Sequence, residues 1–270
     1  MDLGLAGRVC VVTGASRGIG RETARQLCAE GARVLLVARG EEVLSDAVEL
    51  CRDEGDGAKR VAEGLALDVT DGDAGERIVA EAERHFDRVD VLVNNAGTAR
   101  WRSLDEVPDD DWQAAWELNV MAPLRAMRAA VPGMRERGWG RVVNVASTAG
   151  KRPSAMMPEY SVAKAAELSL SRLFADQCAA DGVLVNAVCP GPTKSELWMG
   201  EGGLLDQSQR AAGHSSREEA LEASGAKRPI RRLAEVEEIA GAIVFLCSER
   251  ASYVAGAAWS VDGGTVQVII

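Results

Sequence analysis

A tyrosine and a lysine stand four residues apart in the segment Tyr160-Ser161-Val162-Ala163-Lys164. At this spacing two side chains of a helix lie on the same face, one turn apart. A free tyrosine has a pKa of about 10 and is a poor acid–base catalyst at neutral pH. A neighbouring ammonium favours the phenolate, so the pair predicts a tyrosine that exchanges protons with a substrate.

A serine is placed to join this pair. Ser147 follows a strand-like apolar run over residues 141–146, and a short loop can return its hydroxyl to the same cavity. The hydroxyl can then hold a carbonyl oxygen while Tyr160 gives that oxygen a proton and a cofactor delivers hydride. An isolated Tyr-x-x-x-Lys pair is better explained as an ordinary helix face. The chain has only two tyrosines, however, and the combination with a serine and an upstream glycine turn is far more specific.

The glycine turn follows the first strand-like run and leads directly into a helical segment. Glycines allow a tight turn and a close approach of backbone to phosphate, and a helix N-terminus offers free N–H groups to an anion. A lone glycine turn is weak evidence, but its place at the first strand-to-helix junction indicates a dinucleotide site. The residues expected to contact the cofactor phosphates are Gly14, Ser16, Arg17, Gly18, Ile19 and Gly20.

The end of the second strand-like run indicates which dinucleotide is bound. An acidic residue there would accept hydrogen bonds from the ribose 2′-OH of NAD and would repel a 2′-phosphate. This chain has Ala38 and then Arg39, and both Arg39 and Arg17 can bring a guanidinium group to a phosphate. Either arginine alone is more often a solvated charge. Together with the missing acid they predict NADP(H) in preference to NAD(H).

Two further turns are expected beside the cofactor. Asp68 and Val69 end the third strand-like run, where the carboxylate can accept a hydrogen bond from the adenine amino group. Asn95, Ala96 and Gly97 follow the fourth run and can line the cofactor trough. Taken by themselves, a helix cap and a plain turn explain these segments equally well.

Apolar runs that alternate with helical segments must position these residues. Continuous apolar strands separated by amphipathic helices predict a parallel sheet covered on both faces. We therefore expect one α/β domain over residues 1–270, a doubly wound Rossmann fold with a seven-stranded parallel sheet. The expected strands are 8–13, 33–38, 64–68, 89–94, 141–146, 184–189 and 258–261. The expected helices are 19–30, 42–54, 73–86, 112–137, 161–180 and 235–248.

A long excursion over about residues 192–232 departs from this alternation. It contains several glycines and two short helical patches, at 204–212 and 216–223. An excursion after a strand is where an α/β enzyme places a lid or substrate wall, although an insertion without function is the alternative. Substrate contacts are expected from Trp101, Met156, Met157 and Trp198, which predict an apolar or aromatic ketone. Lys151 and Arg152 can meet an anionic group, but solvated loop charges explain them better.

Composition excludes several classes of function. The formal net charge of −10, without a basic patch, argues against nucleic-acid binding. The six scattered cysteines show no metal-ligand spacing, so neither disulfides nor a bound metal is expected. The first residues lack a signal-peptide pattern, and no apolar run approaches the ~20 residues of a membrane span. We expect a cytoplasmic protein that does not bind membranes.

Over nearly its whole length the chain resembles the short-chain dehydrogenase/reductase family. It has, in order, that family's TGxxxGxG, NNAG, Ser–YxxxK and PG motifs. The resemblance implies catalytic Ser147, Tyr160 and Lys164, and implies that Asn119 holds a water that links Lys164 to solvent. It also implies that Tyr160, Lys164, Pro190, Gly191, Thr193 and Ser195 contact the cofactor; Ser195 replaces the more usual threonine but keeps the hydroxyl.

The expected activity is the NADP(H)-dependent interconversion of a ketone and a secondary alcohol. Within the family the chain is most similar to bacterial ketoreductases of the 3-oxoacyl carrier-protein reductase kind. One alternative is an NAD-dependent secondary-alcohol dehydrogenase that works oxidatively, and a remote one is a non-catalytic NADP(H) sensor or scaffold. The resemblance further implies a homotetramer, in which the apolar residues Val268, Ile269 and Ile270 are expected to be buried, at least partly by a neighbouring subunit.

Overall fold

Seven parallel strands form one sheet in the computed structural model, which describes residues 2–54 and 61–267. The order across the sheet is β3-β2-β1-β4-β5-β6-β7, which confirms the predicted doubly wound α/β fold. The strand bounds are β1 (Val9–Thr13), β2 (Arg33–Ala38), β3 (Ala62–Ala66), β4 (Val91–Asn94), β5 (Gly140–Val145), β6 (Val183–Pro190) and β7 (Ala258–Val261).

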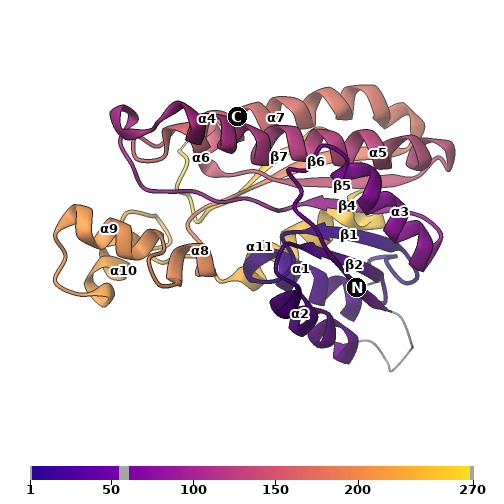
Figure 1. Cartoon of the computed structure of the whole chain (residues 1–270), viewed down its shortest axis with the longest axis horizontal. Coiled ribbons are helices and arrows are strands. Elements are labelled where there is room, and N and C mark those ends of the chain that lie inside the picture. The colour runs from indigo at the N-terminus through magenta and orange to yellow at the C-terminus, as the bar shows by residue number, and fades with distance from the viewer. Residues whose placement is uncertain (1, 55–60, 268–270) are drawn as a thin grey trace.

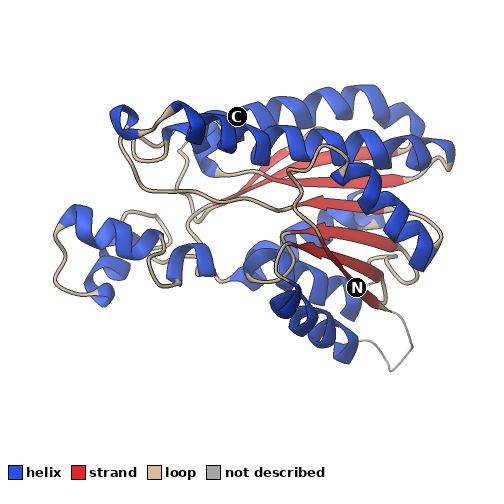
Figure 2. Ribbon diagram, in the orientation of Figure 1, coloured by secondary structure: helices blue, strands red, loops and turns tan. Residues whose placement is uncertain are grey.

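Helices cover both faces of the sheet, as Figure 2 shows. One layer contains α1 (Gly18–Ala29), α2 (Glu41–Glu54) and α11 (Val236–Cys247). The other contains α3 (Ala74–Phe86), α5 (Ala122–Glu136) and α7 (Pro158–Cys178). Alternate strand residues point into the two cores, so Cys10 and Val12 belong to the first core and Val9 and Val11 to the second. The central strands β1 and β2 are therefore mostly apolar, as the sequence pattern predicts, whereas the edge strands β3 and β7 are partly exposed.

The strand order reverses between β1 and β4. β1 pairs with β2 on one side and with β4 on the other, so the loops that follow β1 and β4 diverge to opposite faces. In open α/β sheets a ligand binds outside the carboxyl ends of the strands at such a switch point. The glycine turn after β1 and the Asn95–Gly97 segment after β4 both lie there.

The helix expected over residues 112–137 is interrupted, and in this respect the prediction was wrong. Helix α4 (Asp109–Trp116) passes into a π-helical turn, η2 (Glu117–Met121), before α5 begins. Pro123 explains the change, because it has no N–H to donate to Asn119 O and its ring crowds that carbonyl. The Ala122 N–H donates to Glu117 O instead, which is the five-residue step of a π-helix.

Three helices in the excursion stand apart from the two helix layers, on the left in Figure 1. They are α8 (Glu196–Met199), α9 (Leu204–Ala212) and α10 (Arg217–Ala226). The sequence predicted the last two and missed α8, which is a single turn. The remaining short elements are η1 (Leu104–Glu106), α6 (Thr148–Lys151), η3 (Ala179–Asp181) and η4 (Glu249–Ala251).

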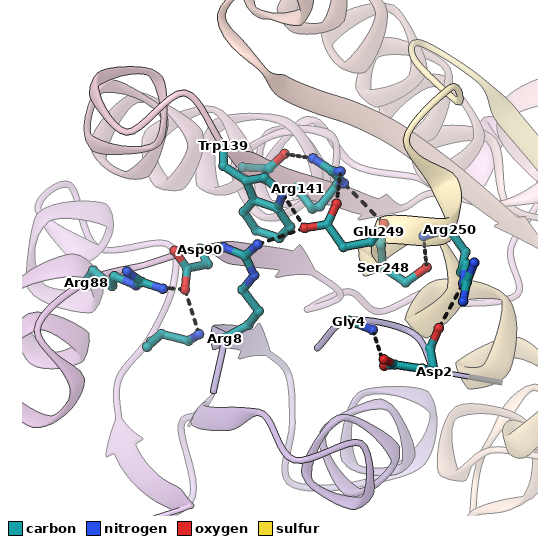
Figure 3. Close-up of polar contacts among 12 residues, drawn as sticks. Asp2, Gly4, Arg8, Arg88, Asp90, Trp139, Arg141, Ser248, Glu249 and Arg250 are labelled. Atoms are coloured by element: carbon teal, nitrogen blue, oxygen red, sulfur yellow. Dashed lines mark hydrogen bonds and ion pairs between the residues drawn. The ribbon is translucent and has the colours of Figure 1, made fainter. Parts of the chain in front are cut away.

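A polar cluster ties the opposite, amino-terminal edge of the sheet to the end of α11 (Figure 3). The Arg8 and Arg141 guanidinium carbons lie 3.6 and 4.5 Å from the centre of the Trp139 ring. Glu249 accepts hydrogen bonds from Arg8 at 2.8 Å and from Trp139 Nε1 at 2.9 Å. Because this edge faces away from the switch point, the cluster holds strands and helix together without entering the candidate site.

The structure also bears on the expectations about membrane spans, metal ions, cysteines and the C-terminal residues. Within residues 2–54 and 61–267 no helix is both long and apolar enough to cross a membrane. The same residues contain no group of three or more His, Cys, Asp or Glu side chains that could hold a metal ion. All six cysteines are buried free thiols. Val268, Ile269 and Ile270, which were expected to be buried, lie outside the described residues.

Candidate active site

Tyr160 and Lys164 lie in the first two turns of α7, on one face. The helix begins with Pro158, whose fixed φ suits a first helical position and whose missing N–H would have no helical partner. Lys164 Nζ is 5.7 Å from the centre of the Tyr160 ring. Tyr160 is half-buried, whereas Lys164 is only 2% exposed. The structure thus brings the two groups together as their spacing predicts.

The Lys164 ammonium is held by two acceptors inside the protein. Its Nζ donates to Val145 O at 2.8 Å and to Glu167 Oε2 at 2.8 Å. Burial lowers the pKa of Lys164, but the attraction of Glu167 and Tyr160 outweighs burial and raises that pKa above its usual value. Sequence reasoning missed Glu167, and the available signal was its position three residues after the lysine.

Ser147 stands between the end of β5 and α6. Its Oγ accepts a hydrogen bond from Ala149 N at 3.0 Å and so caps the short helix. A hydroxyl that accepts one such bond keeps its own hydrogen for another partner. Ser147 is half-buried, so this hydrogen can be offered to a ligand oxygen.

The π turn places Asn119 near the Lys164 ammonium. Asn119 is 1% exposed, and its Nδ2 donates to Ala115 O at 2.9 Å. Its Oδ1 is buried without a hydrogen-bond partner in the described structure. A methyl group on Gly97 would lie 3.3 Å from Asn119 Oδ1 and 3.7 Å from Lys164 Nζ. The unused acceptor and the ammonium therefore face the same small volume beside Gly97.

The glycine turn after β1 packs closely against the loop after β4. Gly14 has a φ of +64°, and a methyl group there would lie 2.8 Å from Ala96 Cα. A methyl group on Gly20 would overlap Asn95 Nδ2 and Gly14 O. Asn95 Nδ2 donates to Thr13 O at 2.9 Å and to Gly14 O at 3.1 Å, so its amide shapes the turn.

The N-terminus of α1 has no side-chain cap, although Glu196 Oε2 would lie 3.8 Å from a methyl group on Gly18. The first turn of α1 contains no acidic residue. Arg17 is exposed at the N-cap position, while Ser16 is buried and Ile19 packs against the first core. A methyl group on Gly18 would lie 3.3 Å from Ser195 Cβ, so the turn also borders the start of the excursion. These features fit a dinucleotide phosphate.

Asp68 and Arg39 lie close together beyond the ends of β3 and β2. The Arg39 guanidinium is 80% exposed and lies 3.8 Å from Asp68 Oδ2. Partial burial raises the pKa of Asp68, but hydrogen bonds from Thr70 and the charge of Arg39 together lower it below its usual value. β3 ends at Ala66, two residues before the predicted end, so Asp68 stands in the following turn, and Val69 packs against the second core.

The turn after β6 is fixed by backbone contacts. Pro190 ends the strand, and Gly191 N donates to Val261 O at 3.0 Å. A methyl group on Gly191 would lie 2.9 Å from Asp262 Cα. Thr193 is buried, and its hydroxyl donates to Gly191 O at 2.9 Å, while Ser195 stands at the N-cap of α8. The predicted cofactor turn is therefore rigid, with the excursion starting directly after it.

Three of the four predicted substrate residues gather beside Tyr160. Buried Trp198 forms an apolar cluster with Leu204 and Leu205, and partly buried Trp101 and Met157 pack against that cluster. Tyr160 packs against it as well. Met156 is not part of it; its carbonyl accepts a hydrogen bond from Arg102 N at 2.9 Å.

Two polar contacts were not predicted. Gln207 Oε1 of α9 accepts a hydrogen bond from Trp101 N at 2.7 Å, which joins the excursion to the loop after β4. Lys151 Nζ donates to Ala258 O at 2.6 Å and to Ser260 Oγ at 3.0 Å. Lys151 is thus engaged with β7, whereas Arg152 is exposed.

Comparisons with known proteins agree on the class of molecule. Residues 14–266 match a family model described as "Enoyl-(Acyl carrier protein) reductase". A 3-oxoacyl-acyl-carrier-protein reductase of Vibrio cholerae is 34% identical over 266 residues, 98% of this chain and 100% of that protein. L-sorbose reductase from Gluconobacter frateurii, solved with NADPH and L-sorbose, has a TM-score of 0.91 at 35% identity over 100% of both chains. An actinorhodin polyketide ketoreductase solved with NADPH has a TM-score of 0.88 at 34% identity, covering 96% of this chain and 97% of its own.

Proposed function

The chain belongs to the short-chain dehydrogenase/reductase family of oxidoreductases, and we propose that it interconverts a ketone and a secondary alcohol with NADP(H). The observation that carries this proposal is the Tyr160–Lys164 pair, whose ammonium donates to Val145 O, two residues before Ser147 at the carboxyl end of β5. A phenol, an ammonium and a hydroxyl are the groups that a carbonyl oxygen needs when it takes up a proton.

In the direction of reduction the cofactor supplies hydride, and side chains of this chain handle the oxygen and the proton. Ser147 donates a hydrogen bond to the carbonyl oxygen and fixes its position. Tyr160 gives its phenolic proton to the same oxygen. Lys164, held by Val145 O and Glu167, contributes a positive charge that stabilises the tyrosinate left behind.

The proton on Tyr160 must then be replaced. Asn119 Oδ1 and Lys164 Nζ face the same volume beside Gly97, and Asn119 Oδ1 is without a partner among the described residues. A water bridging these two groups would connect the ammonium to solvent. This arrangement supports Asn119 as the residue that anchors the relay.

The preference for NADP(H) rests on charge at the end of β2. Ala38 offers no carboxylate to a ribose, and the exposed guanidinium groups of Arg17 and Arg39 can pair with a 2′-phosphate. The related L-sorbose reductase and polyketide ketoreductase were both solved with NADPH. NAD-dependent oxidation of a secondary alcohol is the alternative.

The substrate wall favours an apolar or aromatic ketone. Trp101, Met157 and Trp198 lie beside Tyr160, and the excursion over residues 192–232, which we propose as a lid on this single domain, completes the wall. A polyhydroxylated ketone is a second candidate, because Trp101 Nε1 is a buried donor without a partner among the described residues. The related L-sorbose reductase was solved with such a ketone.

A cofactor-oxidation screen tests the proposal. The purified chain is mixed with NADPH or NADH and with an aromatic ketone, a 3-oxoacyl thioester, a ketose or an enoyl thioester. Oxidation of NADPH by a ketone, faster than oxidation of NADH, is the expected result. Turnover of the enoyl thioester alone would contradict carbonyl reduction. Tight NADPH binding without oxidation by any compound would favour a sensor or scaffold.

A further inference from the structure

A carboxylate that the proposed mechanism does not need as a reactant lies beside the catalytic ammonium. Glu167 Oε2 is 2.8 Å from Lys164 Nζ, and the two side chains are 1% and 3% exposed. Ion pairs on protein surfaces contribute little, but a buried pair determines the charge state of both partners. The Lys164–Glu167 pair therefore bears on whether the lysine is charged during turnover.

The position of Glu167 is fixed by a network that reaches the sheet. Its backbone carbonyl accepts a hydrogen bond from Ser171 Oγ at 2.9 Å, and Ser171 Oγ accepts one from Asn144 Nδ2 of β5 at 2.7 Å. Asn94 Nδ2 of β4 donates to Asn144 Oδ1 at 2.8 Å. Two neighbouring strands thus anchor the turn of α7 that carries the carboxylate.

Lys164 has few other groups that could balance its charge. Its second acceptor, Val145 O, is neutral. Cys189 on β6 is a neutral thiol near physiological pH, because burial raises its pKa to about 11. Asn119 in the π turn is neutral, and Lys151 at the end of α6 is a cation bonded to β7. Within the described structure Glu167 is the one carboxylate paired with this ammonium.

We propose that Glu167 is a positioning residue for the reaction, which keeps Lys164 in its ammonium form and holds the ammonium against the end of β5. The proposal rests on the proposed function, since it assigns the charge on which Tyr160 depends. Without the carboxylate, burial of Lys164 favours the neutral amine. The rate of carbonyl reduction should then begin to fall at a lower pH than in the natural chain.

The first test follows Lys164 directly in protein without cofactor. The chain has five lysines, so NMR of selectively labelled lysine side chains resolves their titrations, and Lys164→Arg assigns the signal of Lys164. In the natural chain the pKa of Lys164 should lie above the usual value for a lysine side chain. In Glu167→Gln this lysine should titrate about one pH unit or more lower than in the natural chain. An unchanged or raised titration would overturn the proposal.

Two further variants keep this test decisive if Glu167→Gln does not fold. Glu167→Leu removes the same charge with an apolar side chain, and the titration of Lys164 should fall as it does with glutamine. Glu167→Asp keeps the negative charge on a side chain one methylene shorter, and the pKa of Lys164 should lie between its values in the natural chain and in Glu167→Gln. If aspartate behaved like glutamine, packing and not charge would be the role of Glu167.

The second test is the pH profile of NADPH-dependent reduction. The alkaline limb of kcat/KM should move to lower pH by about one unit in Glu167→Gln. The control is Asp176→Asn, which removes an exposed carboxylate paired with Arg172 further along α7 and should leave the limb in place. If the natural enzyme is active and the alkaline limb of kcat/KM does not move in Glu167→Gln, the role of Glu167 is refuted and the proposed function is not. A natural chain without reductase activity would instead refute the proposed function, and the NMR result would remain valid.

Discussion

The reacting groups of the candidate site differ in how much freedom they keep. Tyr160 is half-buried, and no described residue forms a hydrogen bond with its hydroxyl. Ser147 uses its oxygen in a helix cap but keeps its hydrogen. Lys164 is buried and has two fixed acceptors. The groups that we propose to touch the substrate are thus accessible, whereas the proposed supporting charge is fixed, which is the preorganisation that electrostatic catalysis requires.

Tyr160→Phe tests the proposed proton donor. The variant should lose about 10²–10⁴-fold in kcat for ketone reduction, because that is the usual contribution of general acid catalysis. Affinity for NADPH, measured by fluorescence titration, should change by no more than a few-fold. Tyr253→Phe is the control, since Tyr253 is fully exposed and is the only other tyrosine. Retention of more than about a tenth of the natural rate would exclude Tyr160 as the acid.

Ala38→Asp tests how the cofactor is chosen. A carboxylate at the end of β2 would repel a 2′-phosphate and accept a hydrogen bond from a ribose hydroxyl. The ratio of kcat/KM for NADPH to that for NADH should therefore fall by about tenfold or more, as a change of one or two kcal/mol predicts. Leu104→Asp, which adds the same charge in exposed η1, should leave the ratio unchanged. An equal ratio in both variants would show that this position does not contact the adenine ribose.

Local spacing allowed some of the site to be predicted, and tertiary contacts decided the rest. Tyr160 and Lys164 share a helix, so four residues of separation determined their common face. The role of Asn95 in shaping the glycine turn depends on β4 lying beside β1, which no local pattern shows. The same holds for Lys151, whose partners in β7 are 107 and 109 residues away.

At the scale of elements, two departures from regular structure lie at the site. The π turn follows from Pro123 and places Asn119, whereas sequence periodicity alone predicted an unbroken helix. The excursion was predicted from its glycines and its position, but α8 is too short to give a periodic signal. Gln207 joins the excursion to the Trp101 loop through one hydrogen bond, in addition to the packing of Trp101 against the apolar cluster of the excursion.

Hydrogen exchange tests whether the excursion is a lid. Amides of α9 and α10 should exchange fastest among the helices of the free protein and become protected when NADPH and a substrate ketone bind. Gln207→Ala should increase exchange in α9 and in the Trp101 loop, while Gln177→Ala on α7 should not. Equal protection with and without ligands would contradict the lid.

In the whole molecule, a stabilising polar cluster and the candidate site lie at opposite ends of the strands. The arginine, tryptophan and glutamate cluster around Trp139 binds the amino-terminal edge, and the candidate site occupies the carboxyl edge. The parallel topology was predictable because the five inner strands are buried on both faces. Association between copies was expected from the family resemblance, and it stays a prediction for which the α5–α7 surface is the candidate contact.

A groove of about 610 Å³ runs between α5 and α7 on the outside of the molecule. Its lining is mostly apolar and includes Leu170, Leu173 and Phe174; Leu173 is 58% exposed. Arg128 and Glu136 lie on the same lining, so two copies related by a two-fold axis can pair opposite charges around an apolar centre. Exposed apolar side chains that line a groove can mark a contact with another protein. We therefore propose that the groove contacts a second copy of this chain.

Leu173→Glu should break this contact. Burying a carboxylate against a neighbouring apolar surface is costly, so the variant should be smaller in solution, whereas the natural chain should be a dimer or a tetramer. Light scattering coupled to size-exclusion chromatography measures the mass directly. Leu50→Glu is the matched control, because it places the same substitution on an exposed leucine of α2, in the opposite helix layer. A natural chain that is monomeric, or a Leu173→Glu variant of unchanged mass, would show that the α5–α7 groove is not the interface between subunits.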